Sequence, residues 1–129
     1  MPELKDPQDP HDRIRPVYVT YFGKHYEDLR FPLESDDKPG LRRGQAGALH
    51  AIAAHFTFKT EPAVVTMPTG SGKTVVLALS PFILRANRVL VITPSRLVRA
   101  QITDEFATLG RVISTGALGR SPTLPRVIE

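Results

Sequence analysis

The sequence predicts an α/β fold built around a parallel sheet. Residues 62–67 and 88–92 are two short apolar runs, and residues 74–85 between them have the composition of an apolar helix. A strand, a crossover helix and another buried strand form a βαβ unit, in which the strands run parallel and the connection is right-handed. A glycine-rich loop separates the first strand from the helix. Open parallel sheets place their ligands at this carboxyl edge.

The loop, residues 67–74, reads Met-Pro-Thr-Gly-Ser-Gly-Lys-Thr. Its two glycines let backbone N–H groups turn toward a phosphate, and its lysine supplies a cation for the outer phosphates. The following helix adds free N–H groups and the positive end of its dipole. We therefore predict a nucleotide phosphate site with Mg²⁺ bound by Thr74. Its residues are Thr69, Gly70, Ser71, Gly72, Lys73 and Thr74. The alternative is an ordinary turn with a solvated lysine.

The chain before the loop divides into three parts. Residues 1–16 combine prolines with alternating charges, which predicts a disordered lead-in. Residues 17–40 form a leader with a possible strand at 17–22 and a polar break at 34–40. From residue 41 the apolar spacing becomes helical, and we expect 41–129 to be one partial domain. His50 and His55 lie on this helix and are interpreted as surface or half-buried residues instead of metal ligands.

The chain after the loop predicts further elements. Pro81 should kink or end the first helix. Thr93 is suited to cap the next helix and Pro94 to occupy its first position. Asp104 and Glu105 are interpreted as solvated charges on that helix. Its apolar stripe comprises Val98, Ile102, Phe106 and Leu109. Residues 111–115 are a possible third strand, residues 116–125 a loop without a packed element, and residues 127–129 a possible strand start.

Composition limits the protein class. The chain has 129 residues, the size of one domain, and contains no cysteine, which excludes disulfides and thiolate sites. Because no apolar run reaches about 18 residues, we expect a soluble, cytoplasmic protein. Residues 85–128 hold seven arginines against Asp104 and Glu105. Such a basic region can follow a phosphate backbone, although a solvated basic face explains the charge equally well.

Three stretches together resemble the first RecA-like domain of superfamily-2 helicases and translocases, in the branch of restriction-enzyme helicase subunits and UvrB-like proteins. Residues 67–74 resemble the phosphate-binding motif I. Residues 41–48, Leu-Arg-Arg-Gly-Gln-Ala-Gly-Ala, resemble the upstream element whose glutamine reads adenine, which implies that role for Gln45. Residues 93–101 are similar to motif Ia, and this implies that a turn contacts the nucleic-acid backbone. The turn comprises Thr93, Pro94, Ser95 and Arg96.

The resemblance implies a RecA-like, three-layer P-loop fold with a parallel sheet, present here incompletely. It implies an ATP-binding fragment of a DNA helicase or translocase, with ATP and Mg²⁺ as cofactors and Lys73 and Thr74 in catalytic roles. DNA is expected in preference to RNA, and the remainder of a helicase is an expected partner. The family's acidic strand end and second RecA-like domain do not occur in these 129 residues, so we expect little ATPase activity.

Two other functions remain open from the sequence. The chain could be a different P-loop nucleotide enzyme, such as a small kinase, in which Gln45 would not select adenine. It could also be a non-catalytic basic domain that binds nucleic acid or protein and carries a vestigial loop. A melting temperature that rises with ATP and Mg²⁺ would favour the two nucleotide-binding functions, because a ligand of the native state raises stability. An unchanged melting temperature would favour the non-catalytic domain.

Overall fold

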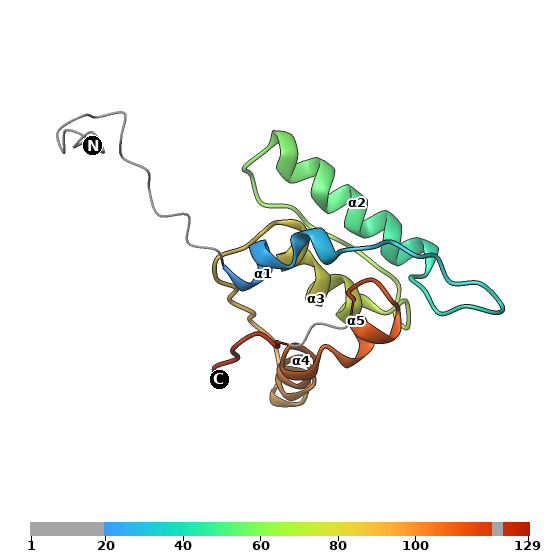
Figure 1. The fold of residues 1–129 in the computed structure, drawn as a ribbon. Coiled ribbons are helices and arrows are strands. Elements are labelled where there is room, and N and C mark those ends of the chain that lie inside the picture. Colours follow the sequence, from blue (N-terminus) through green and yellow to red (C-terminus); the bar gives the residue numbers. More distant parts are fainter. Residues whose placement is uncertain (1–19, 120–122) are drawn as a thin grey trace, which may run out of the picture.

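The structure is a computed structural model that describes residues 20–119 and 123–129. Within these residues it contains helices and isolated β-bridges but no β-strand. The elements are α1 (Tyr21–Lys24), the 3-10 turn η1 (Tyr26–Asp28), α2 (Arg43–Phe58), α3 (Lys73–Ile83), α4 (Arg96–Thr108) and α5 (Gly110–Ser114). Figure 1 shows α2 and α4 lying on different sides of the central α3. None of the described helices is both long enough and apolar enough to cross a bilayer.

Helix α3 is the centre of the hydrophobic core. It contacts α1, α2, α4 and α5, and most of its residues are buried. Leu49 of α2 is fully buried, as are Leu79 and Phe82 of α3. Each such side chain contributes roughly 1.5–3 kcal/mol through removal from water. The helix that begins at the loop lysine is therefore firmly anchored, and the predicted helices around 41–56 and 74–85 are confirmed in α2 and α3.

The predicted parallel sheet is not found in the described part of the chain. The pre-loop segment (residues 62–67) and the post-helix segment (residues 88–92) contain no helix, turn or bend, but neither is paired. Their backbone groups form no hydrogen bonds within the described residues. Val64 is 94% exposed, and Leu90 and Ile92 are each 85% exposed. A strand needs a neighbour to satisfy its backbone, and the described residues supply none.

The strand predicted at 17–22 is wrong for Tyr21 and Phe22, which lie in α1. The Thr20 side chain accepts a hydrogen bond from the Gly23 amide at 3.2 Å and so caps this short helix. Phe22 is buried, with its ring centroid 4.9 Å from that of Phe82. Tyr21 and Phe22, two of the side chains that suggested a strand, therefore pack on α3. Residues 17–19 and the predicted disordered lead-in lie outside the described residues.

The start of α4 differs from the prediction. Ser95, and not Thr93, is the N-cap residue, and its hydroxyl accepts a hydrogen bond from the Val98 amide at 3.3 Å. The helix begins at Arg96, so Pro94 lies outside its first position. Of the predicted stripe, Phe106 and Leu109 are buried and Ile102 is half-buried, whereas Val98 is exposed. Only the C-terminal half of α4 is thus anchored in the core.

Residues 111–115 were predicted as a strand, but residues 110–114 form α5. Leu109 has φ 52° and ends α4, and the Glu105 carboxylate accepts hydrogen bonds from the amides of Arg111 (3.1 Å) and Val112 (3.2 Å). The interpretation of Glu105 as a solvated charge is therefore wrong, since it is only 5% exposed, whereas Asp104 is exposed. The Glu105 carboxylate therefore accepts from the free N–H groups at the start of α5. In a strand, these N–H groups would instead bond to a neighbouring strand.

The remaining C-terminal predictions also need correction. Ala117 is fully buried and Leu118 is 1% exposed, so the loop predicted at 116–125 does carry packed residues. Leu118 forms an isolated antiparallel bridge with Leu29, which joins this loop to the leader. Residues 127–129 are not a strand in the structure. Residues 120–122 of the predicted loop lie outside the described part.

Candidate nucleotide site

The glycine-rich loop turns sharply before it enters α3. The Ser71 amide and hydroxyl both donate to the Pro68 carbonyl, at 3.2 and 2.6 Å. Gly70 has φ 79° and Gly72 has φ 81°, which is the left-handed region that glycine adopts without strain. This geometry leaves several amides without an acceptor within the described residues. They are those of Gly70, Gly72, Lys73 and Thr74.

Lys73 and Thr74 are the first two residues of α3. The Lys73 side chain is exposed and forms no ion pair or hydrogen bond with the described residues, and the same residues leave the Thr74 hydroxyl without a hydrogen bond. The positive end of the α3 dipole lies at the same point. The loop therefore offers amide donors, a cation and a hydroxyl. These groups fit a polyphosphate with a hard cation such as Mg²⁺, which prefers oxygen ligands. Thr69, also predicted for the site, is exposed in the loop.

Gln45 connects α2 to the loop. Its side chain is buried, its carbonyl oxygen accepts from the Arg42 amide at 2.9 Å, and its amide nitrogen donates to the Gly72 carbonyl at 3.1 Å. The Arg42 guanidinium also donates to the Gly70 carbonyl at 2.7 Å. A carboxamide has two donor hydrogens and two acceptor lone pairs. Gln45 therefore retains one of each after these contacts, enough to engage the edge of a base.

Gly72 is restricted by Gln45 as well as by its own backbone. A Cβ atom at residue 72 would collide with the Gln45 side-chain nitrogen. At Gly70 the same added atom would meet open space. Sequence reasoning assigned Gln45 to the base alone and missed its contact with the loop. Spacing along the sequence could not have found this contact, because 27 residues separate Gln45 from Gly72.

A pocket of about 250 Å³ lies beside the loop. Its lining includes Gln45, Gly72 and Thr74 from the predicted site, together with Glu34 and Arg42. The lining also includes Arg111 and Ser114 of α5 and Thr115, which follows this helix. Sequence analysis did not include these α5 residues in the site, because it expected a strand there. The leader, the loop and α5 thus meet at one cavity.

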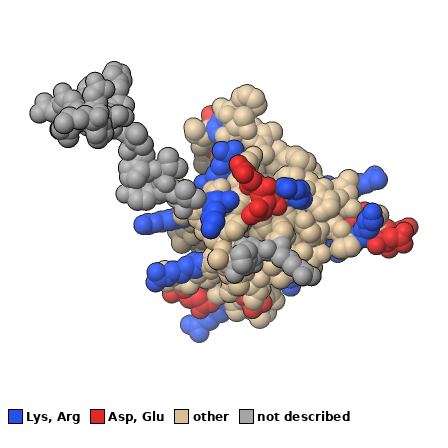
Figure 2. All heavy atoms as spheres, viewed as in Figure 1, with Lys and Arg blue, Asp and Glu red and all other residues tan. Residues whose placement is uncertain are grey.

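The predicted nucleic-acid residues lie at a separate hollow of about 350 Å³, which is lined by residues 91–96 and Arg99. Arg96 and Arg99 are exposed, lie three residues apart on α4 and form no ion pair with the described residues. Thr93 donates to the Ser95 carbonyl at 3.3 Å, and Pro94 lies between them. Figure 2 shows basic side chains scattered over the visible face, some at its margin and some beside acidic side chains nearer its middle, instead of one continuous patch.

Residues 38–117 match a family model described as type III restriction enzyme, res subunit. The chain matches no curated protein and no solved structure. The matched region covers more than half of the chain and includes Gln45, the loop and the turn at 93–96. The resemblance found from the sequence motifs is thus confirmed, whereas the sheet expected from it is not. The chain belongs to the type III restriction enzyme res subunit family, whose domain is a RecA-like P-loop helicase domain.

Proposed function

We propose that this chain binds ATP with Mg²⁺ at the glycine-rich loop and holds the backbone of DNA at the turn formed by residues 93–96. The observation that supports this most strongly is the set of amides at the start of α3, beside the Lys73 ammonium, that have no partner among residues 20–119 and 123–129. The family supports the same general function, because it is a helicase family that uses ATP. The proposal makes this chain the nucleotide-binding part of a DNA-dependent motor.

Each residue of the nucleotide site has a chemical role in this proposal. The amides of the loop surround the β-phosphate, Lys73 neutralises the outer phosphates, and the Thr74 hydroxyl coordinates Mg²⁺. Gln45 directs its remaining donor and acceptor to the adenine edge, and the pocket between the loop and α5 receives the base. Because Gln45 also binds the Gly72 carbonyl, recognition of the base and the position of the loop are linked through one side chain.

The DNA contact follows from the start of α4. Within the described residues, the amides of Arg96 and Leu97 have no acceptor. Free amides at a helix N-terminus bind phosphate without reading sequence. Arg96 and Arg99 add two cations on the same exposed part of the helix. The resulting contact should be independent of sequence and sensitive to salt.

Nucleotide binding is tested by the melting temperature of the full chain with and without ATP and Mg²⁺. A ligand present at 100 times its dissociation constant adds about 2.7 kcal/mol to the stability of the native state. Lys73→Ala should remove this gain, whereas Lys59→Ala should retain it. Lys59 is an exposed lysine at the end of α2 and serves as the matched control. An unchanged melting temperature in the wild type would exclude ATP binding.

DNA binding is tested by the affinity for a fluorescent single-stranded DNA as salt is raised. The double variant Arg96→Ala, Arg99→Ala should weaken binding and lower the slope of log affinity against log salt by about two, one for each lost phosphate contact. Arg43→Ala removes an exposed arginine from α2 and should leave the slope unchanged. An RNA of the same sequence shows which nucleic acid is preferred, and equal or tighter RNA binding would contradict the choice of DNA.

A further inference from the structure

The pocket beside the loop contains one acid that the proposed function does not use. Among the described residues that line this pocket, Glu34 is the only acidic one. It belongs to the leader and lies before residues 38–117, the part of the chain that matches the family model. A carboxylate is an unexpected group beside a loop that offers amides and Lys73 to an anion, because like charges repel. The presence of Glu34 therefore calls for a role other than phosphate binding.

The backbone of Glu34 is held by a tight loop of the leader. Its amide donates to the Leu41 carbonyl at 2.9 Å, and the Leu41 amide donates to the Pro32 carbonyl at 2.7 Å. Leu41 is fully buried, which anchors this loop in the core. Gly40 is packed so closely that a Cβ atom there would collide with the backbone of Leu33 and Glu34. These contacts fix the place of Glu34 at the edge of the pocket.

Arg42 connects Glu34 to both ends of the candidate nucleotide site. Its Nε atom lies 4.0 Å from Glu34 Oε2. Its backbone amide donates to the Gln45 side chain, and its guanidinium donates to the Gly70 carbonyl. In the proposed function, Gln45 faces the base and the loop holds the phosphates. The sugar of a nucleotide lies between its base and its phosphates, so a nucleotide bound in this way brings its sugar to the side of the pocket that Arg42 and Glu34 form.

We propose that the Glu34 carboxylate accepts a hydrogen bond from the ribose 2′-hydroxyl of ATP, so that the chain selects ribonucleotides over deoxyribonucleotides. This inference rests on the proposed function. An ionised carboxylate only accepts hydrogen bonds, and a sugar hydroxyl donates one. The same pairing reads the ribose in dinucleotide-binding folds. A site built to bind a hydroxyl rejects the analogue that lacks it, because the carboxylate is then left without its partner.

Titration calorimetry of the full chain with ATP and with dATP, each in the presence of Mg²⁺, tests the proposal. In the wild type, dATP should bind about tenfold more weakly than ATP, because a hydrogen bond to a charged group is lost. Glu34→Ala should weaken ATP binding to the level of dATP, so that the two dissociation constants become equal. Glu34→Gln retains an acceptor oxygen and should give an intermediate ratio of the two constants.

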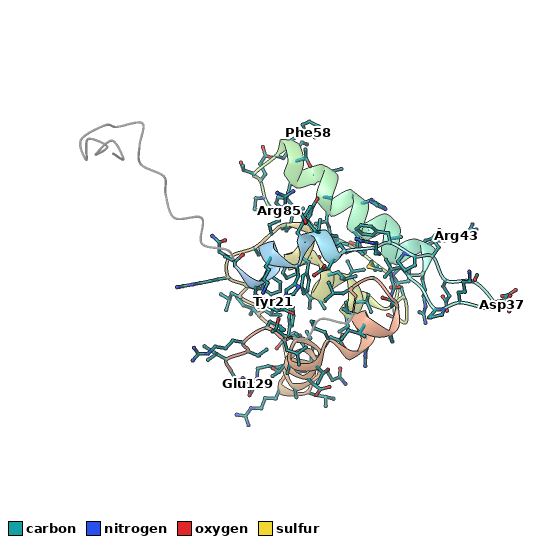
Figure 3. All side chains as sticks on the ribbon, in the orientation of Figure 1. Tyr21, Asp37, Arg43, Phe58, Arg85 and Glu129 are labelled. Carbon is teal, nitrogen blue, oxygen red and sulfur yellow. The ribbon has the colours of Figure 1, made fainter. Side chains whose placement is uncertain are left out.

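Asp37→Ala is the matched control, because it removes the same charge from the same loop of the leader. Asp37 is exposed and lies at the tip of this loop, away from the helices, as Figure 3 shows. It is not among the residues that line the pocket, so this variant should keep the wild-type ratio. The Glu34 side chain is itself 57% exposed, and none of the three variants should change the circular dichroism spectrum.

The ratio of the two dissociation constants separates this role from the other roles open to Glu34. If Glu34 only supported Arg42 or held Mg²⁺, Glu34→Ala would weaken both nucleotides equally and leave the ratio unchanged. If the carboxylate faced the phosphates, the same variant would bind both nucleotides more tightly. Either result, or equal binding of ATP and dATP by the wild type, would overturn this inference and leave ATP binding in place. A wild type that binds neither nucleotide would overturn the proposed function as well.

Discussion

The glycine-rich loop with α3 and the post-helix segment with the start of α4 are adjacent in sequence but differ in how they are held. The loop is fixed by its own glycine conformations and by hydrogen bonds from Arg42 and Gln45, and it leads into the most buried helix. The post-helix segment has no backbone hydrogen bonds within the described residues, and the first half of α4 is exposed. The glycine-rich loop is therefore held firmly by other residues. The post-helix segment and the start of α4, which follow it closely in the sequence, are exposed and weakly held.

The difference has a physical cause. A phosphate loop is stabilised locally, by residues that adopt positive φ and by a helix that satisfies its own backbone. A strand is stabilised only by another strand, so its order depends on a partner distant in sequence or in another chain. The glycine-rich loop can thus form within a short chain, whereas the post-helix segment depends on such a partner.

The largest expected difference concerns two leucines. Leu79 is 1% exposed in the core, and Leu90 is 85% exposed. Leu79→Ala should lower the free energy of unfolding by about 2–5 kcal/mol, because it removes buried contacts and leaves a cavity. Leu90→Ala should change it by at most about 0.5 kcal/mol in dilute protein. Urea denaturation at low protein concentration measures both. Comparable losses would mean that the two regions are equally packed.

The next effect concerns two adjacent acids on α4. Glu105→Ala removes the carboxylate that accepts the Arg111 and Val112 amides, and unsatisfied buried donors cost about 1–3 kcal/mol. Asp104→Ala changes an exposed neighbour and should have an effect within about 0.5 kcal/mol. Thermal denaturation of the two variants gives the comparison. A loss confined to Asp104→Ala would show that Glu105 does not support α5.

Much of the helical structure and the loop could be predicted from the sequence, because both are governed by local rules. The apolar spacing around Leu49 predicted α2, and the glycines predicted the phosphate loop. The strands at 62–67 and 88–92 were predicted from composition, which cannot show whether a partner is present. The helix α5 was missed because its amides are satisfied by Glu105, which lies six residues before Arg111. The pattern of residues 111–115 alone therefore cannot show that Glu105 supports a helix there.

The candidate site shows the same limit. Lys73 and Thr74 occupy the first turn of α3 as expected, because the glycine-rich pattern places them there. The contact between Gln45 and the Gly72 carbonyl joins residues on two elements, so it became visible only in the structure. The α5 residues of the adjoining pocket were missed for the same reason. The motifs thus predicted the site residues, and the structure added the residues that contact them.

The smallest expected effect tests the start of α4. Ser95→Ala removes the side chain that accepts the Val98 amide and should cost about 1 kcal/mol, the usual loss when a capping hydroxyl is removed. Thr93→Ala should cost less, because the Thr93 hydroxyl donates to the Ser95 carbonyl and caps no helix amide. Thermal denaturation measures the two losses. If α4 instead began at Pro94 with Thr93 as its cap, the order of the losses would be reversed. The Thr93 hydroxyl and carbonyl would then accept from the amides of Arg96 and Leu97, and the proposed phosphate contact at this turn would lose its donors.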